Sequence, residues 1–117
     1  MRVFVYGTLM PGELRWPALE RFSVGWERAT ARGRMWDSGH GYPAVRFDAG
    51  GAAIPGVVVT LAPDRLAEAV ATLDAIEGEG SLYRRIEIVT SAGSATTYEW
   101  LGTTDGLAVL EDGWPVG

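Results

Sequence analysis

The chain of 117 residues contains no cysteine and a single histidine. Without cysteine there is no disulfide framework, no thiolate nucleophile and no cysteine metal site. His40 alone does not supply the ligands of a zinc site, so we expect no bound metal. These absences exclude small disulfide-stabilised folds, cysteine-based catalysis and zinc chemistry.

Lysine, asparagine and glutamine are absent as well, and all ten basic residues are arginine. The absence of lysine excludes Schiff-base chemistry and the lysine of a P-loop. An anion bound by this chain must therefore be bound by arginine, hydroxyl groups or backbone N–H groups. The arginines are spread along the sequence, and the net charge is −5 with a pI near 4.8. Nucleic acid is not an expected partner, because binding phosphates requires clustered positive charge.

Long apolar runs are also missing, since no stretch approaches the roughly 18 residues that suggest a membrane-spanning helix. The N-terminal sequence MRVFVYG has neither the length nor the small-residue cleavage pattern of a signal peptide. We therefore expect a cytoplasmic protein without a membrane partner. The length suits one domain with a real core, so residues 1–117 are interpreted as a single domain.

Hydrophobic patterning predicts several short strands and one convincing helix. Strands are predicted at 3–6, 24–35, 54–61, 83–90 and 96–101, and a short one follows the glycine-rich loop that begins at residue 37. Residues 13–22 suit a helical turn or two interrupted by Pro17. The C-terminal stretch is expected to be mostly loop, with an apolar turn at 107–110. These elements indicate an α+β domain built as a small barrel or a highly curled sheet.

The convincing helix carries a carboxylate on its apolar face. Glu77 follows three apolar residues at helical spacing and shares their side of the helix, namely Leu66, Val70 and Leu73. Gly78 supplies the backbone freedom that ends a helix, which places Glu77 in the last turn. There the negative end of the helix dipole and partial burial both oppose ionisation of the carboxyl group.

Two interpretations of Glu77 remain open from spacing alone. In one, the side chain turns to solvent or pairs with Arg84 or Arg85, as charges at helix ends often do. In the other, the carboxyl group points into a cavity and takes part in chemistry. Glu79, between two glycines, is interpreted as a solvated loop charge.

The loop after the first strand is the second feature with chemical content. YGTLMPG follows a buried strand and presents consecutive backbone N–H groups at Gly7, Thr8 and Leu9, an arrangement that can bind an anion. It lacks the P-loop pattern GxxxxGK[ST]. Taken alone, this loop is also compatible with an ordinary turn. Tyr42 in GYPAV and Tyr83 at a strand start are likewise compatible with loop shaping and packing.

Five short motifs follow one another along the chain. They are YGTL at 6–9, GYPAV at 41–45, PGVVVTL at 55–61, LDAIEG followed by LYRR at 73–85, and YEW at 98–100. Their order resembles the gamma-glutamylcyclotransferase-like superfamily, in particular its AIG2-like branch. LDxxEG with YxR a few residues later is the most specific part. The resemblance covers residues 3 to 101.

The resemblance implies a small mixed β-barrel with one or two flanking helices. It also implies an enzyme that releases 5-oxoproline from a small gamma-glutamyl substrate without a cofactor. The glutamate matching Glu77 is then the catalytic acid and base, and the tyrosine matching Tyr83 helps to close the pocket. The loop that forms the cavity floor and binds substrate matches Tyr6, Gly7, Thr8 and Leu9.

Two further residues are candidates for binding the substrate. Tyr42 lies in the GYPAV loop. Arg85 shares a strand face with Tyr83, from which a guanidinium can hold a carboxylate with two hydrogen bonds. An ion pair of Arg85 with Glu87 or Asp74 is an equally good interpretation.

The implied reaction needs a base and an oriented substrate but no protein nucleophile. The substrate's α-amine attacks its own γ-carbonyl, while Glu77 takes a proton from the ammonium and returns one to the departing amine. The N–H groups at 7–9 hold either the α-carboxylate or the developing oxyanion. The leaving group stays open among a glutathione-like peptide, an amine, an amino acid and a carrier.

Two other functions are weighed against this one. The first is a non-catalytic small-molecule-binding or interaction module that retains the cavity. The apolar setting of Glu77 argues against it, because an unused buried carboxylate is a liability. The second is a hydrolase using Glu77 and Glu79 as a pair, which is disfavoured because their side chains diverge at the helix end. The oligomeric state is left open.

Overall fold

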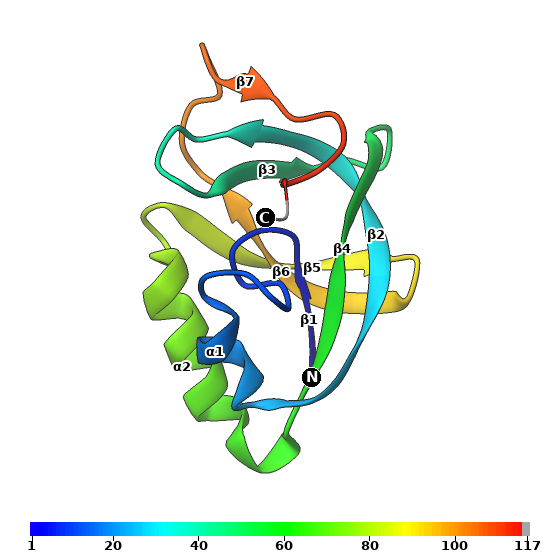
Figure 1. Cartoon of the computed structure of the whole chain (residues 1–117), viewed down its shortest axis with the longest axis vertical. Helices are drawn as coiled ribbons and strands as arrows, with labels where there is room; N and C mark the ends of the chain where they lie inside the picture. The colour runs from blue at the N-terminus through cyan, green and yellow to red at the C-terminus, as the bar shows by residue number, and fades with distance from the viewer. Residues whose placement is uncertain (116–117) are drawn as a thin grey trace.

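The short apolar strand β1 organises the sheet in the computed structural model, which describes residues 1–115 (Figure 1). The strands are β1 (Arg2–Val5), β2 (Ser23–Asp37), β3 (Pro43–Phe47), β4 (Ala52–Leu61), β5 (Tyr83–Thr90), β6 (Gly93–Trp100) and β7 (Ala108–Val109). The helices are α1 (Trp16–Glu20), α2 (Leu66–Glu77) and the 3₁₀-helix η1 (Pro63–Arg65). β1 pairs antiparallel with β4 and parallel with β6, so the sheet is mixed.

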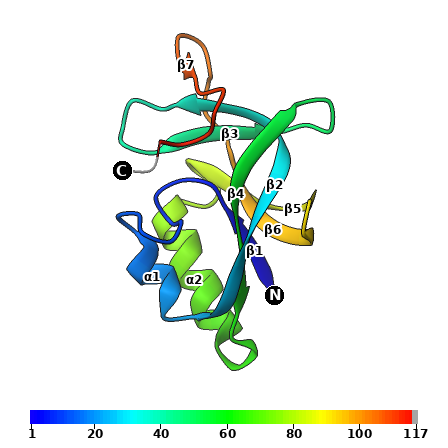
Figure 2. The same ribbon diagram turned by 45° about the vertical axis from the view of Figure 1, so that its right-hand side comes forward.

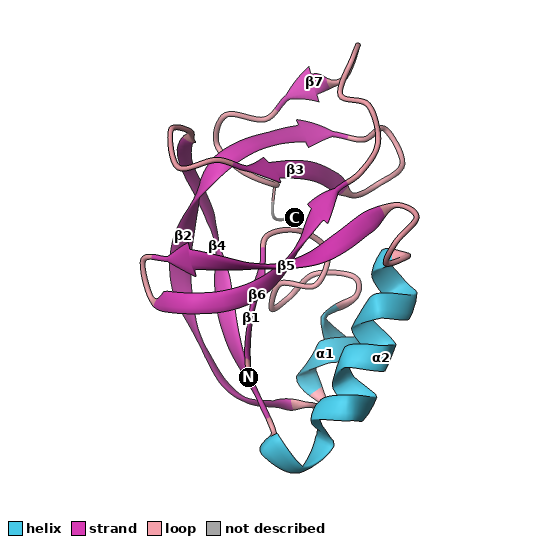
Figure 3. Ribbon diagram, turned by 180° about the vertical axis from the view of Figure 1, so that it is seen from behind, coloured by secondary structure: helices cyan, strands magenta, loops and turns pink. Residues whose placement is uncertain are grey.

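The sheet curls into a nearly closed barrel (Figure 3). Its hydrogen-bonded order is β3-β2-β4-β1-β6-β5, and β7 adds to β2. Contacts between the two ends of this order close the barrel. The backbone N–H of Phe47 in β3 donates to the Glu99 carboxylate in β6 at 2.9 Å. A second contact joins the turn between β5 and β6 to β2, where the backbone N–H of Ser91 donates to the carbonyl of Thr30 at 2.9 Å.

Apolar side chains cover both faces of β1 and β4, which explains their continuous hydrophobic sequences. One set fills the barrel interior and includes Phe4, Tyr6, Met35, Val45 and Val58. The other set packs against the helices and includes Val3, Val5, Val57, Val59, Leu19, Phe22 and Leu73. Figures 1 and 2 show α1 and α2 side by side on this second face.

Helix α2 ends as its sequence predicts. Gly78 adopts the left-handed conformation, with φ of 61° and ψ of 51°, and its N–H donates to the carbonyl of Asp74. Glu77 is therefore the last residue of the helix. The buried positions are Ala69 and Leu73, whereas Val70 is half-exposed, so the buried face is turned slightly from the predicted one.

The predicted α+β barrel with flanking helices is confirmed, and the main differences are local. Pro17 does not interrupt a helix, because it occupies the first turn of α1, where its missing N–H costs nothing. Part of the segment at 107–110 forms β7 instead of only a turn. Among the described residues, the helices are too short and too polar to cross a membrane.

The close approach of β4 to β1 depends on Gly56. A Cβ atom at this position would lie 2.5 Å from the carbonyl oxygen of Val5 and 2.6 Å from the ring of Phe4. We expect Gly56→Ala to lower the free energy of unfolding by about 1–3 kcal/mol, because the added methyl overpacks the sheet.

Gly25→Ala in β2 is the matched control, since a Cβ there meets no atom within 4 Å. Its effect should stay within about 0.5 kcal/mol, as for ordinary surface substitutions. Urea denaturation followed by circular dichroism measures both variants. Equal destabilisation by the two substitutions would contradict this packing.

Candidate active site

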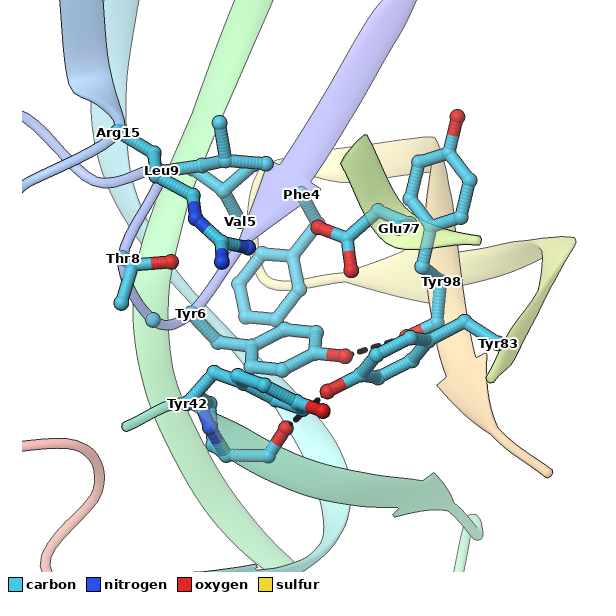
Figure 4. A pocket seen from close by; sticks show the side chains of 12 residues that line it. Phe4, Val5, Tyr6, Thr8, Leu9, Arg15, Tyr42, Glu77, Tyr83 and Tyr98 are labelled. Carbon is cyan, nitrogen blue, oxygen red and sulfur yellow. Dashed lines mark hydrogen bonds between the residues drawn. The ribbon is translucent and has the colours of Figure 1, made fainter. Parts of the chain in front are cut away.

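A cavity of about 30 Å³ lies between the loop after β1 and the end of α2 (Figure 4). It collects residues from six separate parts of the chain, and seven of the eight predicted site residues line it. Those seven are Tyr6, Gly7, Thr8, Leu9, Tyr42, Glu77 and Tyr83. The lining also includes Phe4, Val5, Arg15, Pro43 and Tyr98. Thus the two features with chemical content in the sequence share one cavity.

Glu77 enters the cavity from the last turn of α2. The residue as a whole is half-exposed, but its carboxyl group is enclosed closely enough that burial raises its pKa to about 7, against the opposing charge of Arg15. Within residues 1–115, the Glu77 side chain forms neither an ion pair nor a hydrogen bond with another group. The nearby arginines are engaged elsewhere: Arg84 pairs with Glu99 at 3.0 Å, and Arg85 pairs with Asp74. The carboxylate is therefore free to meet a ligand.

The loop after β1 is held in place through its carbonyl groups. The N–H of Met10 donates to the carbonyl of Gly7 at 3.1 Å, and the N–H of Arg15 donates to the carbonyl of Thr8 at 2.8 Å. Within the described part of the chain, the N–H groups of Gly7, Thr8 and Leu9 have no such acceptor. This leaves three neighbouring donors available for an anion.

Gly7 is required by the close approach of the Tyr42–Pro43 segment. A Cβ at Gly7 would lie 2.7 Å from the Pro43 ring. The absence of a side chain therefore lets two cavity walls, distant in sequence, meet at van der Waals distance.

Buried tyrosines form much of the remaining wall. The Tyr83 hydroxyl donates to the carbonyl of Pro43, and the Tyr6 hydroxyl donates to the carbonyl of Tyr98 (Figure 4). Burial, followed by the charge of Glu77, raises the pKa of both phenols above the ordinary value. They therefore stay neutral near pH 7, and Glu77 is the lining carboxyl group that titrates there.

Arg85 is the predicted site residue that the structure does not bring into the cavity. Its guanidinium pairs with Asp74, whose carboxylate also accepts a hydrogen bond from the Tyr98 hydroxyl at 2.7 Å. Burial opposes ionisation of Asp74, but the hydrogen bonds from Arg85 and Tyr98 outweigh the effect of burial, so the pKa of Asp74 is lowered. The ion pair braces α2 against β5 and β6 one turn before Glu77. Of the two interpretations of Arg85 from the sequence, the structure shows the ion pair with Asp74, and Arg85 does not line the cavity.

Arg15 and Tyr98 are lining residues that the sequence interpretation missed. Arg15 lies just before α1, with its guanidinium carbon 5.8 Å from the centre of the Tyr42 ring. No periodic pattern marks it, and only its position shortly after YGTL could have drawn attention. Tyr98 lies in the YEW motif, but its contact with Asp74 depends on the docking of α2.

Glu79 stands outside the cavity on the exposed turn after α2. One of its carboxylate oxygens accepts the backbone N–H of Arg85 at 2.9 Å. It does not form a catalytic pair with Glu77. Within residues 1–115, no group of three or more histidine and acidic side chains is placed to hold a metal ion.

We expect the Glu77 carboxyl group to titrate with a pKa of about 7. NMR of side-chain carboxyl carbons measures this value, with Glu77→Gln identifying the signal. Arg15→Met should raise the pKa further, because the arginine charge favours the carboxylate. Arg28→Met, on an exposed part of β2, should leave it unchanged. A Glu77 pKa near the ordinary 4.5 would contradict the enclosed site.

The same shift makes stability depend on pH. Because the pKa is raised in the folded state, the stabilising contribution of protonated Glu77 is present below about pH 4.5 and is lost as the pH rises through about 7. Glu77→Gln should therefore have a higher urea midpoint than wild type at pH 8, and the two should converge near pH 4. A variant that is less stable than wild type at pH 8 would show that Glu77 holds the fold together.

Comparison with known proteins assigns the chain to a family. The sequence matches the family profile described as "Gamma-glutamyl cyclotransferase, AIG2-like" over residues 3–115. The solved structure of protein ytfP from Escherichia coli is 28% identical, with a TM-score of 0.64, covering 97% of this chain and 95% of that chain. No curated protein matches the sequence.

Two more distant structures share the fold. YkqA from Bacillus subtilis is 21% identical with a TM-score of 0.69, covering 93% of this chain and 37% of that chain. Protein PH0828 from Pyrococcus horikoshii is 20% identical with a TM-score of 0.63, covering 95% of this chain and 86% of that chain. On the match over residues 3–115, the chain belongs to the AIG2-like gamma-glutamyl cyclotransferase family.

Proposed function

We propose that this protein is a cofactor-independent enzyme that releases 5-oxoproline from a gamma-glutamyl compound, with Glu77 as acid and base. One observation carries the proposal. An unpaired carboxylate with a pKa of about 7 shares a cavity with the free backbone N–H groups of Gly7, Thr8 and Leu9. Membership of the cyclotransferase family supports this reaction class.

The reaction begins when ionised Glu77 takes a proton from the substrate's α-ammonium group. The freed amine attacks the γ-carbonyl carbon, and the new C–N bond closes a five-membered ring. The C–N bond to the leaving group then breaks, and protonated Glu77 gives its proton to the departing nitrogen. The ring nitrogen, which carried a positive charge after the attack, loses its second proton to the departing amine or to water, which leaves the neutral lactam. A pKa of about 7 suits both transfers near neutral pH. All atoms of the substrate appear in 5-oxoproline and the free amine.

The cavity contributes orientation and charge stabilisation. The N–H groups at 7–9 stabilise negative charge, either on the α-carboxylate or on the oxyanion that develops at the γ-carbonyl. The walls formed by Tyr6 and Tyr83 keep the substrate folded toward the ring geometry. Ideal orientation of reacting groups lowers a barrier by up to about 7–11 kcal/mol, so positioning provides much of the rate.

The size of the cavity sets a condition for this reaction. A volume of about 30 Å³ is close to the share of one water molecule, so a glutamyl group enters only when the mouth widens. Among the lining residues, Thr8, Arg15 and Tyr42 are half-exposed, whereas Tyr6 and Tyr83 are buried, so the mouth of the cavity lies at the first three. The small volume also favours a second candidate, a binding or interaction module that keeps the cavity without turnover.

The test is incubation with gamma-glutamyl peptides, amino acids and amines, with 5-oxoproline quantified by mass spectrometry. Wild type should release it from at least one compound. Glu77→Gln should lower kcat/KM by about 10²–10⁴-fold, the usual contribution of a general acid and base. Glu79→Gln is the matched control, because Glu79 is an exposed carboxylate two residues after Glu77. The Glu79→Gln variant should retain activity.

The pH profile provides a second readout. With wild type, kcat/KM should fall below about pH 7, because protonated Glu77 cannot act as the base. Binding of a gamma-glutamyl compound without release of 5-oxoproline would establish the binding module instead. Full activity of Glu77→Gln would rule out the proposed mechanism.

A further inference from the structure

A second hollow lies at the end of the barrel away from α1 and α2, where the C-terminal part of β2 meets β3, β7 and the start of β4 (Figure 1). Its volume is about 650 Å³, which is within the usual range of small-molecule sites. It shares no lining residue with the cavity at Glu77. The hollow is therefore large enough for a small organic molecule and is separate from the proposed reaction.

Two arginines stand side by side in the wall of this hollow. Arg34 in β2 and Arg46 in β3 are directly opposite in the antiparallel register, so their side chains leave the same face of the sheet. Like charges in this arrangement destabilise a strand pair, a cost that an anion between them would offset. Among residues 1–115, neither arginine forms an ion pair. Arg46 donates to the carbonyl of Gly102 at 2.7 Å, which leaves most donors of the pair available.

An indole ring lies beside these two charges. Trp36 follows Arg34 by two residues in β2 and therefore shares its face of the strand. The guanidinium carbon of Arg34 lies 5.5 Å from the centre of the Trp36 ring, which is half-buried and lines the hollow. A flat aromatic surface next to paired positive charges suits a ligand with a planar ring and an anionic group.

Two carboxylates in the lining narrow the choice of ligand. Asp48 and Glu111 are exposed and line the same hollow. One oxygen of Asp48 accepts the backbone N–H of Gly50 at 2.9 Å. The two negative charges oppose a ligand with many charges, such as a polyphosphate. Carboxylates do accept hydrogen bonds from hydroxyl groups, so they suit a sugar.

We propose that this hollow binds a nucleoside monophosphate. Arg34 and Arg46 bind the phosphate, because a guanidinium offers parallel N–H donors that match phosphate oxygens. Trp36 stacks on the base, and the carboxylates of Asp48 and Glu111 accept hydrogen bonds from the ribose hydroxyl groups. Stacking on an aromatic side chain tolerates every base. The structure therefore assigns the class of ligand and leaves the base open.

The test is NMR titration of the backbone amides with AMP, adenosine and inorganic phosphate. AMP should shift the signals of residues 33–36, 46 and 109–111 and should bind more tightly than either fragment. Arg34→Met and Arg46→Met should each weaken AMP binding about tenfold, as for loss of a charged hydrogen bond, and should leave adenosine binding unchanged. Trp36→Leu should weaken AMP and adenosine about fivefold or more and leave phosphate unchanged.

Arg28→Met is the control, since Arg28 is an exposed arginine of β2 outside the hollow, and the variant should bind AMP as wild type does. Thermal unfolding checks that each variant is folded. Equal affinity for AMP and inorganic phosphate would leave no role for Trp36 and would overturn the inference. The same loss of AMP binding in Arg28→Met as in Arg34→Met would indicate unspecific charge attraction and overturn it too. Absence of AMP-induced shifts at these residues would have the same consequence.

Glu77→Gln separates this inference from the proposed reaction. The variant should bind AMP with unchanged affinity, because the two cavities have no residue in common. Absence of 5-oxoproline release from wild type would reject only the reaction. AMP binding that depends on Glu77 would place the nucleotide in the other cavity and reject the site at Arg34 and Arg46.

Discussion

The enclosed carboxyl group of Glu77 is the constraint on which the rest of this structure depends. Burial at the edge of an apolar core makes ionisation costly and raises the pKa to about 7. The cost is tolerated because the surroundings fix the group in place. Gly78 ends α2 immediately after it, and the Asp74 carboxylate ties the last turns of the helix to Tyr98 and Arg85. A less firmly held glutamate would turn to solvent and lose its shifted pKa.

The barrel brings the opposing wall of the site to this glutamate. β1 runs through the sheet between β4 and β6, so its end delivers the loop at 6–9 to the space beside α2. The barrel also brings in the segment around Tyr42 and the start of β5 at Tyr83. Because each wall comes from a different element, the fold as a whole sets the spacing between the Glu77 carboxyl group and the N–H groups of the loop at 6–9.

Local sequence signals were sufficient for the central parts of the site. The helical spacing before Glu77 and the glycine after it predicted a carboxylate in a last turn, and the strand before Gly7 predicted the loop. Contacts between elements were not predictable in this way. Arg85 has the same strand pattern whether it pairs with Asp74 or meets a ligand, and Arg15 joins the cavity only through the folding back of its loop. The strand β7 likewise forms only because β2 is long enough to accept it.

The most direct test of the account is a crystal structure of the protein with 5-oxoproline bound. The account predicts that the ring nitrogen lies within about 2.6–3.2 Å of the Glu77 carboxyl group, as proton transfer requires. It also predicts that an oxygen of the same molecule accepts from the N–H groups of Gly7, Thr8 or Leu9. A molecule bound elsewhere, or a Glu77 side chain turned into solvent in its presence, would contradict the claim that this cavity performs ring closure.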